Sequence, residues 1–64
     1  MNLKLARIKA GLTQKQLAAL VGTSNVTILK IEKGNVDGVR LGTLKAIAKV
    51  LNSSIQELFF SDEQ

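Results

Sequence analysis

Cysteine, histidine, proline, tryptophan and tyrosine are all absent from this 64-residue chain. Without cysteine there is no disulfide and no thiolate metal site, and without histidine the commonest metal ligand and the usual general base are missing. Two phenylalanines are the only aromatic residues. The core therefore has to be built from aliphatic side chains, which at this length favours compact helices or stabilisation by dimer formation.

The residues that remain form none of the familiar catalytic patterns. The five carboxylates are scattered, and the glycines at positions 34, 38 and 42 follow no predicted strand, so they do not form a nucleotide-binding loop. We therefore expect no enzymatic activity, no catalytic residue, no metal or cofactor and no small-molecule ligand. No run of about 18 apolar residues predicts a membrane span. The N-terminus lacks the apolar block of a signal peptide, so we expect a cytoplasmic protein.

Charge is distributed unevenly along the chain. All nine Lys and Arg lie within residues 1–49, together with only Glu32 and Asp37, so this part has a net charge of +7. Residues 50–64 contain three acidic residues and no basic one. A positive body with a negative tail suits a polyanion bound on one side; the alternative is ordinary solubilising charge.

Apolar residues recur at three- and four-residue intervals in five short segments, which predicts a single all-helical domain over residues 1–64. The expected helices cover residues 2–10, a segment capped by Thr13, residues 25–33 capped by Ser24, a segment from a cap at Thr43 to about 51, and a short segment capped by Ser54. Gln16 completes a capping box with Thr13. The residues expected to face the core are Leu3, Ala6, Ala10, Leu17, Ala18, Val21, Ile28, Leu29, Ile31, Leu44, Ile47, Ala48, Leu51, Ile55, Leu58 and Phe59. Leu5 and Ile8 fall off these stripes and are expected to be half-buried or part of a contact surface.

Residues 14–33 have the pattern of a helix, a tight turn and a second helix. Ala18 lets two helices approach closely, and Gly22 can take the positive φ that a sharp exit from a helix needs. Ile28 and Ile31 give the second helix one buried stripe. A helix held in this way by a basic protein suits the major groove of DNA.

The outer face of segment 25–33 carries the candidates for reading bases. Asn25 and Val26 lie in its first turn, where Asn can pair with adenine and Val can pack against a thymine methyl group. Lys30 follows one turn later and can reach guanine. Candidates for contacting phosphates are Thr27 beside this face, Gln14 at the start of the preceding helix, and a group at and beyond the end of segment 25–33, which is Lys33, Asn35 and Arg40. The alternative for each is a solvated surface residue.

Two further pairs of residues have predicted structural roles. Arg7 and Glu32 both fall on inward faces, and a buried charge is tolerated only when it is paired. We therefore expect an ion pair between the first and third helices; the alternative is two exposed charges. Phe59 and Phe60 are adjacent, so one helix cannot bury both on the same face. Phe59 fits the core, and Phe60 is then expected on a partner surface or folded over the domain edge.

Several runs of the chain are similar to one known family. They are Gly11-Leu-Thr-Gln-Lys-Gln-Leu-Ala18, Val21-Gly-Thr-Ser24, Ile28-Leu-Lys-Ile-Glu-Lys-Gly34, Leu44–Asn52 and Ile55–Phe59. On these runs the chain resembles the Cro/repressor-type helix-turn-helix domains of bacteria and phages, also called xenobiotic-response-element-type domains. The resemblance extends over about residues 3–60.

The resemblance implies a five-helix, lambda-repressor-like domain that binds DNA as a dimer, usually as a repressor. Carried over by position, the matching residues are Gln14 and Thr27 for phosphates, Asn25, Val26 and Lys30 for bases, and Arg7 with Glu32 for a buried ion pair. Two departures affect the site. Val26 is apolar where polar residues are common, and Asp37 weakens any phosphate contact near it.

We therefore expect a sequence-specific transcriptional repressor that binds a two-fold symmetric operator as a homodimer. Segment 25–33 of each subunit would enter successive major grooves about one helical turn apart. The C-terminal segment is expected to supply much of the dimer contact, with Leu58 and Phe60 as contact residues. An activator, a restriction–modification controller and an antitoxin stay open, as does a protein-interaction module built on the first helix and Phe60. The expected setting is the DNA-containing nucleoid of a bacterial cell.

Overall fold

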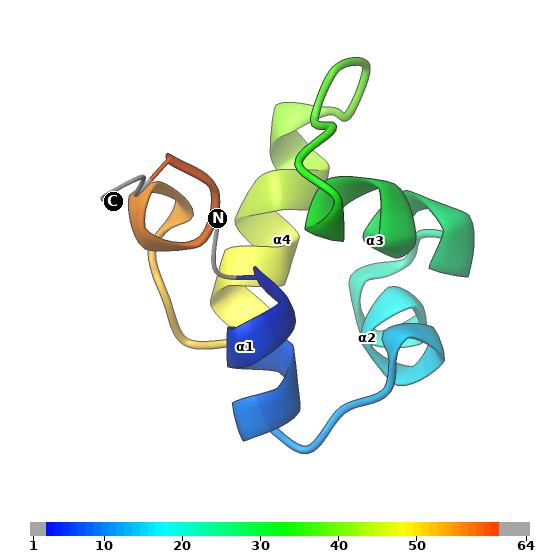
Figure 1. Cartoon of the computed structure of the whole chain (residues 1–64), viewed down its shortest axis with the longest axis vertical. Helices are drawn as coiled ribbons and strands as arrows, with labels where there is room; N and C mark the ends of the chain where they lie inside the picture. Colours follow the sequence, from blue (N-terminus) through cyan, green and yellow to red (C-terminus); the bar gives the residue numbers. More distant parts are fainter. Residues whose placement is uncertain (1–2, 61–64) are drawn as a thin grey trace.

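Five short helices make up the part of the chain that the structure describes. The computed structural model describes residues 3–60, and in that part of the chain every regular element is helical. In chain order the elements are α1 (Leu3–Lys9), α2 (Gln14–Val21), α3 (Asn25–Glu32), α4 (Leu41–Val50) and the π-helix η1 (Gln56–Phe60). Helix α4 runs through the middle, with α2 and α3 on one side and η1 on the other (Figure 1). None of the helices described is long and apolar enough to cross a membrane. The predicted all-helical fold is confirmed.

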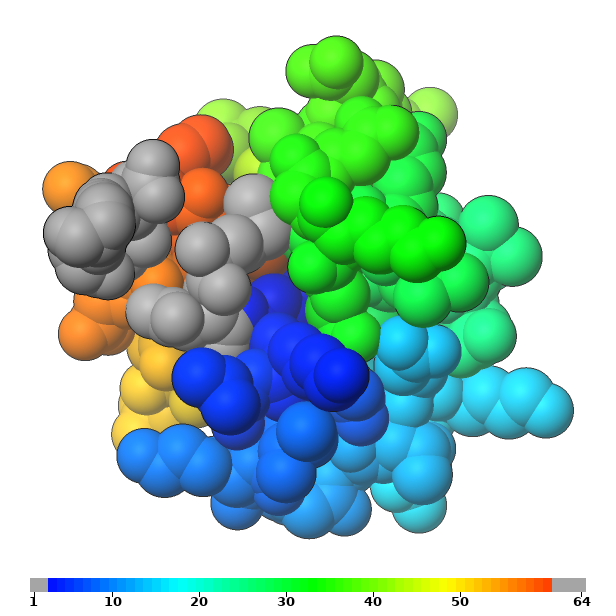
Figure 2. Space-filling view, in the orientation of Figure 1, coloured from blue at the N-terminus to red at the C-terminus, as the bar shows by residue number. Residues whose placement is uncertain are grey.

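Apolar side chains from all five helices form one core. Helix α2 packs against α3 and α4, while α1 contacts both α3 and η1. In the space-filling view α1 lies between η1 and the α2–α3 pair (Figure 2). The buried apolar residues are Leu3, Leu17, Ala18, Ile28, Ile31, Leu44, Ile47, Ala48, Leu58 and Phe59. All of them were predicted to face the core.

Side-chain caps fix the starts of α2 and α3. Thr13 Oγ1 accepts a hydrogen bond from the Gln16 N–H at 3.0 Å, and Gln16 Oε1 accepts one from the Thr13 N–H at 2.8 Å, which is the predicted capping box. Ser24 Oγ accepts a hydrogen bond from the Thr27 N–H at 3.1 Å. Between these caps, Gly22 ends α2 with a φ of 84°, in the left-handed region that residues with a Cβ rarely adopt. The helix, tight turn and helix predicted for residues 14–33 are therefore present.

Helix boundaries differ from the expected ones by one residue at several points. Helices α1, α3 and α4 each end one residue early, and the expected start of the first helix at residue 2 lies outside the described residues. Ala10 is exposed, because it lies in the turn after α1 and not on its inner face. Leu29, which was predicted to help the core, is 39% exposed.

The N-cap predicted at Thr43 is wrong. Helix α4 begins at Leu41, and its N-cap is Arg40, which has an extended backbone and makes no side-chain capping bond. The Arg40 carbonyl accepts hydrogen bonds from the N–H groups of Thr43 at 3.0 Å and Leu44 at 3.2 Å. Because these bonds close the first turn, Thr43 lies inside the helix and its side chain belongs to the helix surface.

The last helix, η1, follows the predicted cap at Ser54. Ser54 Oγ accepts a hydrogen bond from the Glu57 N–H at 3.1 Å, and Glu57 Oε1 accepts one from the Ser54 N–H at 3.3 Å. Leu58 is only 2% exposed, so its side chain fills the core and is not available as the dimer contact that we predicted. Phe60 is 58% exposed, with its ring edge-on to that of Phe59.

Candidate nucleic-acid interface

The exposed face of α3 combines apolar and basic side chains. Leu29 and Lys30 lie three and four residues after Val26, and Lys33 lies three residues after Lys30, so the four side chains share one side of the helix and its end. Val26 is 69% exposed. With Asn35, these side chains line an open hollow of about 290 Å³, here called the outer hollow. Two predicted base-reading residues and two predicted phosphate contacts therefore lie side by side.

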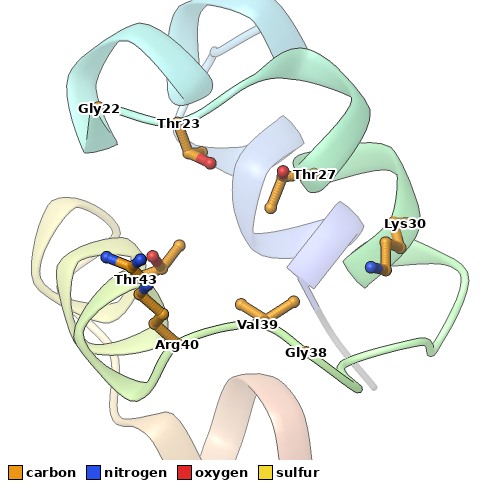
Figure 3. Close-up of a pocket in the computed structure, with 8 residues that line it drawn as sticks. All are labelled: Gly22, Thr23, Thr27, Lys30, Gly38, Val39, Arg40 and Thr43. Atoms are coloured by element: carbon orange, nitrogen blue, oxygen red, sulfur yellow. The ribbon is translucent and has the colours of Figure 1, made fainter.

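A second hollow opens between α3 and the start of α4. Its volume is about 300 Å³, and its lining residues are Gly22, Thr23, Thr27, Lys30, Gly38, Val39, Arg40 and Thr43. Thr23 and Thr27 lie on one wall, and Arg40 and Thr43 lie on the other (Figure 3). Three hydroxyl groups and two cations around one space are a chemistry suited to phosphate oxygens. Lys30 lines this second hollow, here called the inner hollow, as well as the outer hollow.

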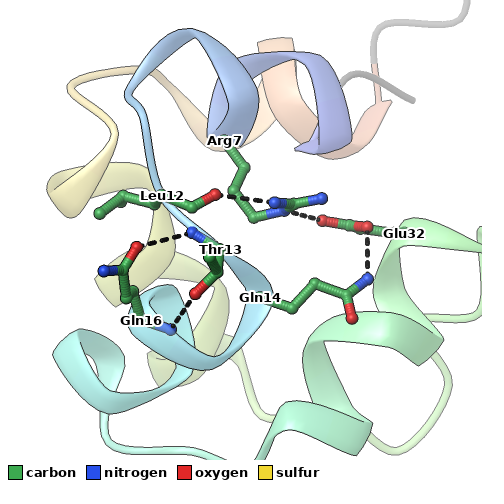
Figure 4. Close-up of polar contacts among 6 residues, drawn as sticks. All are labelled: Arg7, Leu12, Thr13, Gln14, Gln16 and Glu32. Carbon is green, nitrogen blue, oxygen red and sulfur yellow. Dashed lines mark hydrogen bonds and ion pairs between the residues drawn. The ribbon is translucent and has the colours of Figure 1, made fainter.

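A buried ion pair joins α1 to α3. Arg7 Nε donates a hydrogen bond to Glu32 Oε2 at 2.6 Å, and the two side chains are 11% and 5% exposed. Arg7 Nη1 donates to the Leu12 carbonyl at 2.7 Å, and Gln14 Nε2 donates to Glu32 Oε1 at 3.0 Å (Figure 4). Both oxygens of the Glu32 carboxylate are therefore bonded, one to a side chain of α1 and one to a side chain of α2. The predicted pairing of Arg7 with Glu32 is present.

Gln14 and Asn25 point toward other parts of the protein. The sequence pattern predicts a phosphate contact for Gln14, but its amide nitrogen is bonded to Glu32 and its side chain is half-buried. The pattern places Asn25 beside Val26 on the outer face, but Asn25 lines a separate hollow with Gln14 at the start of α2. Asn25 Oδ1 is buried and has no hydrogen-bond partner among residues 3–60. The Gln14 amide is therefore bonded to α3, and the Asn25 side chain lines the hollow beside Gln14.

Thr23, Leu29 and Thr43 belong to this surface and are not among the predicted site residues. Leu29 lies one turn from Val26, so helical spacing alone would have found it, but an aliphatic residue was assigned to the core. Thr23 and Thr43 come together only because α4 packs against α2. No signal in the local sequence indicates that Thr23 and Thr43 line the same hollow.

The chain is similar to several known proteins. The model of the helix-turn-helix family matches residues 3–58. Two proteins of Archaeoglobus fulgidus, each named as an uncharacterized HTH-type transcriptional regulator, are 41% and 37% identical to it. These alignments cover 91% and 98% of this chain and 81% and 87% of the two proteins. A protein of Methanocaldococcus jannaschii named glutamine–fructose-6-phosphate aminotransferase is 30% identical over 95% of this chain, a match that spans 6% of that protein.

These three relatives are archaeal, so they give no support to the expected bacterial or phage source. The family match extends over nearly all of the described residues, and its span includes the helix, turn and helix formed by α2 and α3. The chain belongs to the helix-turn-helix family, as its resemblance to Cro/repressor-type domains predicted.

Proposed function

We propose that this protein is a sequence-specific DNA-binding transcriptional regulator, and that it represses transcription by occupying a two-fold symmetric operator as a homodimer. The observation that carries the proposal is the placing of two hollows on either side of Lys30, one partly apolar and one lined by hydroxyls and cations. With α3 in the major groove, the outer hollow faces base edges and the inner hollow faces the sugar-phosphate backbone. The names of the two Archaeoglobus relatives support the same function.

The position of each residue around the two hollows determines whether we propose that it contacts a phosphate or a base. Thr27 and Arg40 hold a phosphate in the inner hollow, while Lys33 and Asn35 hold one beyond the end of α3. Lys30, between the hollows, reaches a guanine. The positive charges supply the salt-dependent part of the affinity that is common to all sequences. Bound protein then excludes RNA polymerase without any covalent chemistry, so no enzymatic activity is part of the proposal.

Gln14 and Asn25 have smaller parts in this proposal. The Gln14 amide carries a second N–H besides the one given to Glu32, and the backbone N–H groups at the start of α2 lie beside it. These donors suit a phosphate. Asn25 reads adenine only if its amide turns from the contact with α2 into the groove.

Dimer formation is proposed to use Phe60, whose exposed ring is otherwise an unfavourable feature of the surface. A dimer places two copies of α3 about one helical turn of DNA apart. The operator lies on the chromosome, so we propose a cytoplasmic location. A second function, a protein-interaction module without DNA binding, is favoured by Leu5 and Ile8, which are 65% and 53% exposed on α1. That function predicts no affinity for DNA and loss of partner binding in Phe60→Ala.

Titration of a labelled duplex at several salt concentrations tests the proposal. Arg40→Ala removes one phosphate contact, so it should weaken binding to every duplex and reduce the slope of log K against log salt by about 1. Lys49→Ala is the matched control, because Lys49 is exposed near the end of α4 and lines neither hollow. Absence of binding at low salt contradicts the regulator. Equal slopes for Arg40→Ala and wild type contradict the phosphate site.

A further inference from the structure

A groove without a role in the proposed contact with DNA lies between α1 and the chain around the start of η1. It consists of two adjoining hollows of about 340 and 360 Å³, which share Ala6, Lys9 and Ser53 in their walls. The first hollow also reaches Leu5 and Glu57. These two hollows together are here called the α1–η1 groove. It has no lining residue in common with the outer hollow or the inner hollow, so it is a separate surface.

The two walls of this groove carry opposite charges. Lys9 lies on the α1 wall and Glu57 on the η1 wall; both side chains are exposed, and they form no ion pair with each other. Helix α1 contains no acidic residue, and residues 50–60 contain no basic one. Two walls of opposite sign side by side are complementary to a second copy of themselves, because a two-fold axis between them brings each wall onto the other wall of the partner.

Large apolar side chains are exposed beside these charges. Leu5 and Ile8 are 65% and 53% exposed on α1, and Phe60 is 58% exposed on η1. Apolar side chains gathered on two neighbouring helices indicate a contact with another protein surface. Ala6 and Ser53 have small side chains, which leave room in the groove for an aromatic ring. The same face therefore offers both a ring and a space to receive one.

We propose that the α1–η1 groove is the contact between two copies of this chain. Phe60 of each copy enters the groove of the other, and Lys9 of each copy pairs with Glu57 of the other. The inference rests on the proposed function, because it gives the proposed homodimer a particular surface and register. The buried apolar groups supply most of the affinity, while the two ion pairs at the edge fix how the copies are aligned.

Exchange of the two charges tests this contact. Lys9→Glu places two acids opposite each other at both contacts, and Glu57→Lys places two bases there. Each variant alone should therefore have a dimer dissociation constant about tenfold higher than that of the wild type, measured by sedimentation equilibrium. An equimolar mixture of the two variants has opposite charges at both contacts again. It should form a heterodimer about as tight as the wild-type homodimer.

Two further variants serve as controls. Glu57 Oε1 also accepts hydrogen bonds from the Ser54 N–H and hydroxyl at the start of η1, so Glu57→Lys loses a cap as well as a charge. Glu57→Gln keeps an oxygen for that cap, and its heterodimer with Lys9→Glu should be tighter than the Lys9→Glu homodimer. Lys49→Glu makes the same charge change on α4 outside the groove, and it should leave the dimer unchanged.

The outcomes separate this inference from the proposed function. A dimer that is equally strong in Lys9→Glu and Lys49→Glu, or one that no mixture with Lys9→Glu restores, overturns the contact and leaves the regulator standing. A wild-type chain that stays monomeric both in solution and on a duplex with two half-sites overturns the contact together with the proposed homodimer. Absence of wild-type binding to any duplex overturns the regulator, and the mixture then decides the contact between copies by itself.

Discussion

Glu32 links three helices through a single carboxylate. One oxygen accepts from Arg7 of α1 and the other from Gln14 of α2, and the side chain is only 5% exposed. Removing this carboxylate leaves the Arg7 guanidinium buried without its opposite charge. Loss of one partner of a buried pair is strongly destabilising, whereas replacing both partners by apolar residues is often tolerated. The ion pair therefore affects stability mainly because each buried charge, Arg7 or Glu32, requires the other as its partner.

Glu32→Ala should lower the free energy of unfolding by about 3–5 kcal/mol, measured by urea denaturation. The double variant Arg7→Leu with Glu32→Leu should be more stable than Glu32→Ala, because no unpaired charge stays buried. Asp37→Ala, which removes an exposed acid from the loop before α4, is the control and should leave the midpoint unchanged. An unchanged midpoint for Glu32→Ala would show that the pair contributes nothing to stability.

Single residues also show where sequence reasoning reaches its limit. Arg7 and Glu32 were paired correctly because both lie on inward faces of predicted helices, where a charge requires a partner. The bond from Gln14 to Glu32 joins residues 18 apart, and an amide at a helix start suits water, a phosphate or a carboxylate equally well. Which one it meets depends on how α2 packs against α3, and the local sequence does not contain that information.

The turn between α2 and α3 sets how α3 is presented, and one glycine makes that turn. A Cβ on Gly22 would meet nothing within 4 Å, so the constraint there is the φ of 84° and not the space. Gly42 offers the same open space, but it lies in α4 without a positive φ. The two glycines therefore separate backbone conformation from crowding.

Gly22→Ala should destabilise the protein by about 1–2 kcal/mol, because an L-residue is strained in the left-handed region. Gly42→Ala should stabilise it by about 0.5–1 kcal/mol, because glycine is a poor helix former. The melting temperatures of Gly22→Ala and Gly42→Ala, measured by thermal denaturation, test both predictions. If Gly22→Ala melts at or above the wild-type temperature, the turn does not depend on its left-handed residue.

The positions of the helices could be predicted from the sequence more fully than the roles of the residues on their surfaces. Periodicity and capping residues located all five helices, since apolar spacing and cap chemistry are local, although α4 begins three residues earlier than its predicted cap implied. Thr43 was misplaced because a threonine before an apolar stripe resembles a cap, whereas the Arg40 carbonyl already closes the first turn. Leu29 was misplaced because hydrophobicity was taken as evidence of burial, and exposed aliphatic residues are common on protein surfaces.

For the molecule as a whole, formation of the proposed dimer determines how many half-sites of the operator are bound at the same time. The described residues contain one copy of α3, so in the proposed complex one chain contacts one half-site of the operator. Phe60 lies on η1, which Figure 1 places on the opposite side of α4 from α3. A contact between copies at Phe60 therefore leaves both copies of α3 free to approach DNA.

Phe60→Ala should weaken binding to a duplex with two half-sites by much more than binding to a duplex with one. The reason is that only the first duplex gains from linking two copies. Leu20→Ala removes another exposed apolar side chain and should affect neither duplex. Sedimentation equilibrium should show a weaker dimer for Phe60→Ala; an equal loss on both duplexes would show that Phe60 acts on DNA binding and not on assembly.

Whether the protein recognises a DNA sequence is tested by selecting bound duplexes from a random pool at two salt concentrations. A dimeric, sequence-specific regulator should enrich an inverted repeat whose half-site centres lie about one helical turn apart, with the same motif at both salt concentrations. Strong salt dependence without an enriched motif would contradict a sequence-specific regulator and leave only electrostatic attraction. Failure to retain any DNA at the lower salt concentration would contradict the interface itself.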